Sequence, residues 1–184
     1  MKPWEAFTPY EMRNIGAFAR LGWRDRADSL LVFFLRYRRP PGWQQWAEVV
    51  WHDERTPHFI GDLPHTWVGS DFARSVLDLF AYENESDSTL VIAAGVPSAW
   101  VMEPPGLAVR GLSTSLGPLS YTLCPRRGGI EARIEAGPRV PPGGIVLRAP
   151  GSFRRVTVNG SPAAIGPSGE VVLHQLPATV VLRP

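Results

Sequence analysis

Residues 8–37 set the fold of the first part of the chain, and they read TPYEMRNIGAFARLGWRDRADSLLVFFLRY. Thr8 is a suitable helix N-cap, Pro9 stands at the first helical position, and Glu11 follows Thr8 by three residues, as in a capping box. Apolar residues then recur at helical spacing as far as Arg20, and a glycine follows two residues later. This pattern predicts a helix that begins after Thr8 and ends near Arg20.

A second helix is predicted from Trp23 to Tyr37, after a very short link. Its apolar stripe consists of Ala27, Leu30, Leu31, Phe34 and Leu35. The two helices therefore form an antiparallel hairpin, and the sequence RRPPG at residues 38–42 ends the second helix because proline cannot continue it. Further on, residues 44–50 favour a short helix. A longer helix is predicted to begin at Thr66 and to fray near Asn84.

From residue 89 onward the hydrophobic period changes to two, which is typical of strands. Candidate strands cover residues 89–94, 99–102, 107–113, 119–124, 130–136, 144–148, 154–158, 170–174 and 179–182. Short strands with turn signals and no helices between them favour an antiparallel sandwich. We therefore predict an α+β protein in which a helical hairpin segment at 1–88 is followed by an antiparallel β-sandwich at 89–184. The boundary is expected in the ENESDS segment, residues 83–88.

Composition excludes several classes of protein. The formal net charge of +2 is too small to indicate nucleic-acid binding, and the arginines are scattered along the sequence. The single cysteine, Cys124, cannot form an internal disulfide. No apolar run reaches the roughly 20 residues of a membrane span, and the first residues lack the apolar run of a secretory signal. We expect a soluble, cytoplasmic protein that needs no cofactor and binds neither nucleic acid nor a membrane.

Tryptophans and carboxylates gather in residues 43–71, WQQWAEVVWHDERTPHFIGDLPHTWVGSD, which hold four of the seven tryptophans and three of the four histidines. Glu48 is the candidate general base, because a carboxylate beside indole rings has a stacking surface for sugars and an apolar wall that tunes its pKa. Trp43 and Trp46 would supply that surface, and Gln45 would hydrogen-bond a sugar hydroxyl. The alternative is that the tryptophans are packing anchors and Glu48 is a solvated surface acid.

A second polar cluster lies at the start of the third predicted helix. Asp62, His65 and Trp67 are candidate ligand-binding residues there, although Asp62 and His65 would also suit helix capping. The histidines and aspartates of this region do not follow an established metal-ligand spacing such as HExxH, so no metal site is predicted. A serine-protease-like triad of Ser70, His65 and Asp71 is discounted, because no nucleophile-elbow pattern surrounds Ser70.

Two motifs after the helical hairpin carry a resemblance to a known family. They read WQQWAEV at residues 43–49 and LPHTWVGS at residues 63–70, and Glu48 stands 19 residues before Trp67. In order and spacing they resemble the catalytic-base glutamate and the leucine-threonine-tryptophan-serine motif of glucoamylase-like, six-hairpin glycosidases. His65 and the residues 68–69 depart from that motif. The Pro/Gly-rich β part is similar to the all-β tail of some bacterial members, so the resemblance spans most of the chain.

The resemblance implies part of an (α/α)6 toroid and an inverting glycoside hydrolase. Glu48 would activate water while an acid about 6.5 to 9.5 Å away protonates the glycosidic oxygen. In such toroids the acid comes from a central hairpin, upstream of the matched region. We therefore expect a C-terminal fragment of such an enzyme, inactive alone, with an oligosaccharide or polysaccharide as its partner. A homodimer that covers exposed helical surface is the other expected outcome. The alternative function is a non-catalytic carbohydrate- or protein-binding module.

The start of the first predicted helix is a third candidate part of the site. Glu11 and Arg13 lie there, and in a ring of helical hairpins a helix N-terminus can face the central cleft. The alternative is that Glu11 only completes the capping box and Arg13 is solvated.

Overall fold

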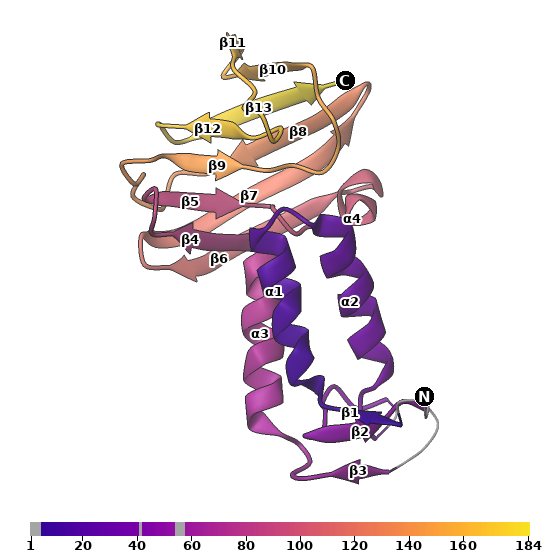
Figure 1. Ribbon diagram of the computed structural model, residues 1–184. Helices are drawn as coiled ribbons and strands as arrows, with labels where there is room; N and C mark the ends of the chain where they lie inside the picture. The colour runs from indigo at the N-terminus through magenta and orange to yellow at the C-terminus, as the bar shows by residue number, and fades with distance from the viewer. Residues whose placement is uncertain (1–4, 41, 54–57) are drawn as a thin grey trace. The chain divides into compact units, whose positions relative to one another are not determined.

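The chain folds into two units that divide between Leu79 and Phe80. The computed structural model describes residues 5–40, 42–53 and 58–184. Within these ranges the protein is mixed α+β, with four α-helices and three sheets in which most neighbouring strands are antiparallel (Figure 1). The α+β class predicted from the sequence is therefore confirmed.

Three α-helices build most of the first unit. They are α1 (Arg13–Arg20), α2 (Arg24–Arg36) and α3 (Thr66–Phe80), and a 3-10 turn (Pro9–Met12) precedes α1. Thr8 is the N-cap, as predicted, and its side chain accepts a hydrogen bond from the Tyr10 amide at 3.4 Å. Gly22 adopts a φ of +77°, which reverses the chain between α1 and α2. The helical hairpin and the start of α3 at Thr66 are confirmed.

The core of the first unit combines the inner faces of these helices with Phe7 and with buried residues of the segment 46–50. Its buried members are Phe7, Met12, Ile15, Ala19, Ala27, Leu31, Phe34, Tyr37, Trp46, Ala47, Val50, Val68 and Leu79. Of the expected α2 stripe, Ala27, Leu31 and Phe34 are buried in this core, and Leu30 and Leu35 are partly buried against it. The apolar stripe predicted from the helical period therefore faces the inside of the unit.

A small antiparallel sheet takes the place of the short helix expected at residues 44–50. Its strands are β1 (Ala6–Phe7), β2 (Val49–Trp51) and β3 (Phe59–Ile60), in the order β1-β2-β3. Val50 pairs with Phe7 and is fully buried, so strand pairing overrides the local helical preference of this segment. Figure 1 shows the sheet at the end of the hairpin where α1 begins and α2 ends. The prediction of a helix here is wrong.

An ion pair whose carboxylate is buried ties α1 to α3. The Arg20 guanidinium donates to both carboxylate oxygens of Asp78 at 2.9 Å. Asp78 is buried, and Gly16 leaves room for it, because a Cβ at Gly16 would lie only 2.8 Å from Asp78 Oδ2. The two helices can therefore approach closely at this point.

The second unit pairs two sheets around one core. The four-stranded sheet has the order β12-β9-β5-β4, and the six-stranded sheet has the order β11-β10-β13-β8-β7-β6. Their strands are β4 (Ala81–Asn84), β5 (Thr89–Ile92), β6 (Leu107–Thr114), β7 (Gly117–Arg126), β8 (Gly129–Ile134), β9 (Ile145–Leu147), β10 (Arg155–Val158), β11 (Ser161–Ala163), β12 (Val171–Leu173) and β13 (Ala178–Arg183). Side chains from both sheets, such as Ile92, Leu147, Leu123 and Val180, are fully buried in the same cluster.

Three details of this unit differ from the expectation. The β5 and β9 strands are parallel, so the sheets are not wholly antiparallel. Residues 99–102 belong to a helix, α4 (Ser98–Met102), rather than to a strand. The ENESDS segment is not a boundary, because β4, which includes its first two residues, pairs with β5, which follows it. Residues 83–88 therefore form the end of a hairpin inside the second unit.

A toroid of helical hairpins, of which the resemblance implied the last part, is not shown. The four α-helices of the described residues are too few for a ring of six hairpins. None of the described helices is both long and apolar enough to cross a membrane.

Candidate functional site

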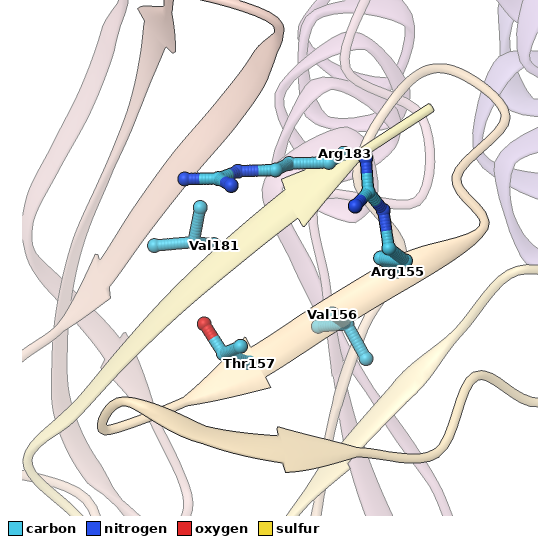
Figure 2. Close-up of a pocket in the computed structure, with 5 residues that line it drawn as sticks. All are labelled: Arg155, Val156, Thr157, Val181 and Arg183. Carbon is cyan, nitrogen blue, oxygen red and sulfur yellow. The ribbon is translucent and has the colours of Figure 1, made fainter.

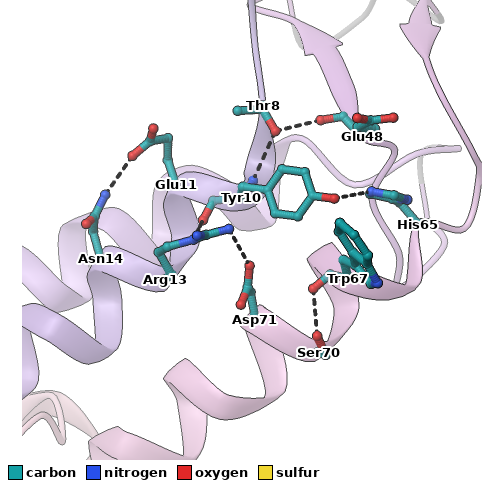
Figure 3. A network of polar contacts seen from close by, with 10 residues as sticks. All are labelled: Thr8, Tyr10, Glu11, Arg13, Asn14, Glu48, His65, Trp67, Ser70 and Asp71. Carbon is teal, nitrogen blue, oxygen red and sulfur yellow. Dashed lines mark hydrogen bonds and ion pairs between the residues drawn. The ribbon is translucent and has the colours of Figure 1, made fainter.

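Three segments that are far apart in the sequence meet at one end of the first unit. They are the 3-10 turn before α1, the residue that precedes β2, and the start of α3 (Figure 3). The small sheet causes this meeting, because β1 leads into the turn, β2 follows Glu48, and β3 leads toward α3. The side chains that gather there are those of Tyr10, Arg13, Glu48, His65, Trp67 and Asp71. We call this group the Tyr10 cluster.

Two neighbours fix the position of Glu48: Thr8 contacts its backbone, and Gly61 lies against its side chain. Its carbonyl oxygen accepts a hydrogen bond of 2.8 Å from the Thr8 hydroxyl. Gly61 approaches its side chain so closely that an added Cβ would lie 2.3 Å from Glu48 Oε2. Gly61 also has a φ of +83°, a conformation that other residues rarely adopt. The Glu48 side chain is half-buried and keeps access to solvent.

Three aromatic side chains of the cluster lie against one another. The ring centroids of Tyr10 and His65 are 5.3 Å apart, and those of Tyr10 and Trp67 are 6.4 Å apart. The Tyr10 hydroxyl and Nε2 of His65 share a hydrogen bond, and the His65 amide donates to the Trp46 carbonyl at 2.9 Å. Trp67 is 69% exposed, so one broad indole surface is free to meet a ligand.

The charges around Tyr10 are mixed. Partial desolvation raises the pKa of its phenol, the negative charges of Glu48 and Asp71 raise it further, and the positive charge of Arg13 lowers it. Arg13 forms a 3.0 Å ion pair with Asp71, and its guanidinium carbon lies 5.3 Å from the Tyr10 ring centroid. Arg13 therefore neutralises Asp71 and leaves Glu48 as the carboxylate without a cationic partner in this cluster.

The arrangement offers three kinds of group to a polar ligand with an apolar face. Glu48 can accept a proton or a hydrogen bond, His65 and Tyr10 can hydrogen-bond a hydroxyl, and Trp67 can stack on a ring. Among the described residues, no group of three or more His, Cys, Asp or Glu side chains could hold a metal ion. The Ser70 hydroxyl donates to the Trp67 carbonyl at 2.8 Å, within the first turn of α3.

Two of the expected tryptophans lie elsewhere. Trp46 is only 3% exposed, donates from Nε1 to the Phe34 carbonyl at 2.9 Å, and packs on Phe72 with centroids 4.7 Å apart. For Trp46 the packing interpretation is correct and the sugar-binding expectation is wrong, since its ring is enclosed by protein. Trp43 is 61% exposed on the turn after α2, and among the described residues it contributes none of the contacts that hold the Tyr10 cluster together.

The other two expected residues flank the cluster in sequence. Gln45 is half-buried, and its carbonyl accepts a 2.9 Å hydrogen bond from the Arg39 amide. Asp62 is exposed on the link between β3 and α3. Neither residue is among those of the polar network drawn in Figure 3. Of the six expected ligand-binding residues, His65 and Trp67 are the two that lie against Tyr10, and the charge of Glu48 acts on the same Tyr10 phenol.

Tyr10 is the residue that sequence reasoning missed. The segment that contains it was interpreted only as a helix-capping signal. Tyr10 nevertheless stands three residues before Arg13, at the same helix start that was considered for the site. Glu11, by contrast, accepts a 2.7 Å hydrogen bond from Asn14 Nδ2 on the exposed side of the helix start. Of the two residues considered at this helix start, Arg13 therefore belongs to the Tyr10 cluster and Glu11 does not.

Comparison with known proteins adds no relative. No protein-family model matches the chain, and no curated protein is significantly similar to it.

Proposed function

We propose that the first unit is part of the catalytic domain of an inverting glycoside hydrolase, with Glu48 as its general base. The observation that supports this proposal is the convergence of Glu48, His65 and Trp67 beside Tyr10. A general base needs a carboxylate that is not neutralised by a cation, and an aromatic ring next to it gives the apolar face of a neutral sugar a surface to stack on. The Tyr10 cluster combines both.

In this mechanism Glu48 removes a proton from a water molecule as the water attacks the anomeric carbon. A carboxylic acid on the other face of the sugar, about 6.5 to 9.5 Å from the base, protonates the leaving oxygen. Asp71 is already engaged by Arg13 in a 3.0 Å ion pair. We therefore assign the acid to helices outside this chain, as the resemblance to six-hairpin glycosidases implies, so that the chain alone binds sugar without cleaving it.

The fold proposed to accompany this function is the last part of an (α/α)6 toroid joined to a β-sandwich. Exposed apolar side chains on the helices support it, since Leu21, Val32 and Leu77 are 60%, 45% and 47% exposed. Further hairpins of a toroid would cover them, and a second copy of the chain would do so in a homodimer.

A non-catalytic binding module is the second candidate function. The exposure of Trp67 favours it, because an indole that lies mostly in solvent can hold a glycan or a protein partner without any acid-base chemistry. In this version Glu48 and His65 would serve as hydrogen-bonding groups. The two functions share the same surface and differ in whether a completed domain hydrolyses the glycan.

Calorimetric titration of the purified chain with neutral glucans and xylans tests both functions. We expect binding that is lost in Trp67→Ala, with Trp43→Ala as a control of similar exposure outside the cluster. Absence of binding to every glycan, or equal loss in both variants, would contradict the proposed site. Hydrolysis by a longer protein that includes further hairpins, abolished by Glu48→Gln, would favour the enzyme over the module.

A further inference from the structure

Two arginines face each other on the surface of the six-stranded sheet. The β10 and β13 strands are antiparallel, and Arg155 lies directly opposite Arg183 in their register. Both side chains are exposed. Figure 2 shows them with Thr157 and Val181, while Val156 is buried in the core. Like charges opposite each other destabilise a sheet, so this pair is unfavourable unless an anion lies near it.

The pair borders two adjacent hollows, each of about 280 Å³. The first is lined by Arg155, Val156, Thr157, Val181 and Arg183. The second is lined by residues that include Arg126, Arg127, Glu131, Val181 and Arg183. Val181 and Arg183 belong to both hollows. The two hollows therefore form one continuous surface, which we call the arginine face.

The arginine face carries an excess of positive charge. Among the residues that the structure describes, four arginines and one carboxylate line the two hollows. That carboxylate, Glu131, accepts hydrogen bonds from Arg126 at 3.0 Å and from Arg133 at 2.8 Å. Its pKa is lowered mainly by the hydrogen bond from Arg126. Glu131 is thus shared by two arginines and leaves Arg155 and Arg183 to attract an external anion.

We propose that the arginine face binds an acidic polysaccharide, a linear chain of sugars that carry carboxylates. The planar guanidinium group matches a carboxylate with two parallel hydrogen bonds. Two hollows side by side suit a ligand whose acid groups repeat along a chain. Thr157 and Val181, which pair two residues further along the same strands, give a floor that is partly hydroxylic and partly apolar, on which a sugar ring can rest.

The lining of the hollows favours a polysaccharide over a nucleic acid. Single-stranded nucleic acids bind to aromatic side chains on which their bases stack. None of the residues that line the two hollows is aromatic. The formal net charge of the whole chain, +2, is also low for a protein that holds a phosphate backbone.

Calorimetry with the full chain tests the proposal. The probes are polygalacturonate, neutral amylose and single-stranded oligothymidylate, each at low and at high salt. We expect polygalacturonate to bind, to lose affinity at high salt because the attraction is screened, and to bind more tightly than the other two probes. Absence of polygalacturonate binding, equal binding of amylose at this face, or tighter binding of the oligonucleotide would overturn the proposal.

Variants locate the binding. Arg155→Ala with Arg183→Ala should weaken polygalacturonate binding roughly 10-fold or more, since hydrogen bonds between charged groups are lost. Arg139→Ala removes the same kind of charge from an exposed loop of this unit and should leave the affinity unchanged. Glu131→Gln frees Arg126 and Arg133 and should strengthen binding. An Arg139→Ala effect equal to that of the double variant, or weaker binding in Glu131→Gln, would contradict the assignment.

The double variant is expected to fold, because it removes a repulsive pair, and its melting temperature should equal or exceed that of the parent chain. The arginine face lies in the second unit and the Tyr10 cluster in the first. Trp67→Ala should therefore abolish binding of neutral glycans and keep binding of polygalacturonate. The two proposals can thus fail separately.

Discussion

The Tyr10 hydroxyl is hydrogen-bonded to Nε2 of His65, although the two residues are 55 positions apart in the sequence. This bond joins the turn before α1 to the start of α3. The charge of Glu48 acts on the same phenol, whose pKa is raised by desolvation first and by Glu48 second. The pKa of Tyr10 therefore depends on how close the Glu48 carboxylate lies to the phenol.

Removal of the Glu48 charge should lower the raised pKa of Tyr10. The phenolate is disfavoured by a nearby carboxylate, so Glu48→Gln makes ionisation easier. Arg13→Gln should have the opposite effect, because Arg13 stabilises the phenolate. Tyrosine Cζ resonances followed by NMR at alkaline pH give both shifts, and Tyr10→Phe assigns the signal. An unchanged Tyr10 titration in Glu48→Gln would place that carboxylate outside the cluster.

A methyl group at position 61 should destabilise the first unit more than one at position 42. Both glycines have a positive φ, +83° and +87°, so alanine is strained at either site. A Cβ added at Gly61 also collides with Glu48, whereas a Cβ added at Gly42 has no heavy atom of the described residues within 4 Å, its chain neighbours left aside. We expect Gly42→Ala to cost about 1 kcal/mol and Gly61→Ala about 2 kcal/mol or more. Urea unfolding measures the difference, and equal costs would contradict the close approach.

The ion pair of Asp78 should contribute more stability than that of Asp71. Asp78 is buried and accepts two hydrogen bonds from Arg20, while Asp71 and Arg13 form an exposed pair. Asp78→Ala leaves Arg20 without its carboxylate and should cost about 1.5 to 3 kcal/mol. Asp71→Ala should cost at most about 1 kcal/mol. Comparable losses in denaturant unfolding would show that the α1 and α3 contact is not as described.

The second unit should lose stability in alkali through Tyr121. This side chain is buried, donates to the Phe80 carbonyl at 2.8 Å, and has a strongly raised pKa because desolvation disfavours the phenolate. The unfolded chain ionises this tyrosine near pH 10, so it binds fewer protons than the folded chain above that pH, and the free energy of unfolding falls as pH rises. Tyr121→Phe should reduce this slope. An identical slope in both proteins between pH 9 and pH 11 would contradict the assignment.

The helices were predictable because their signals are local. The capping residue Thr8, the glycine at position 22 and the apolar period give α1 and α2 almost to the residue. The β2 strand was not predictable, because Val49 and Val50 take their conformation from partners in β1 and β3. The α4 helix was wrongly predicted as a strand, because a segment of only five residues is too short for its hydrophobic period to distinguish a helix from a strand.

The site was predictable only in part, for a similar reason. Trp67 and His65 could be named because they lie within a recognisable helix start. Tyr10 could not, since its role depends on a contact made across the fold. Trp46 shows the opposite error, because a tryptophan beside a carboxylate in sequence can turn its ring into the core.

The most direct test of the sugar site is an NMR titration of the chain with neutral gluco- and xylo-oligosaccharides, observed at the indole N–H groups of its tryptophans. We predict that the Trp67 indole signal shifts with the ligand together with the amides of His65 and Glu48. The signals of Trp43 and Trp46 should stay in place. Shifts at Trp43 without Trp67, or no shift at any ligand concentration, would contradict the claim that the Tyr10 cluster binds a sugar.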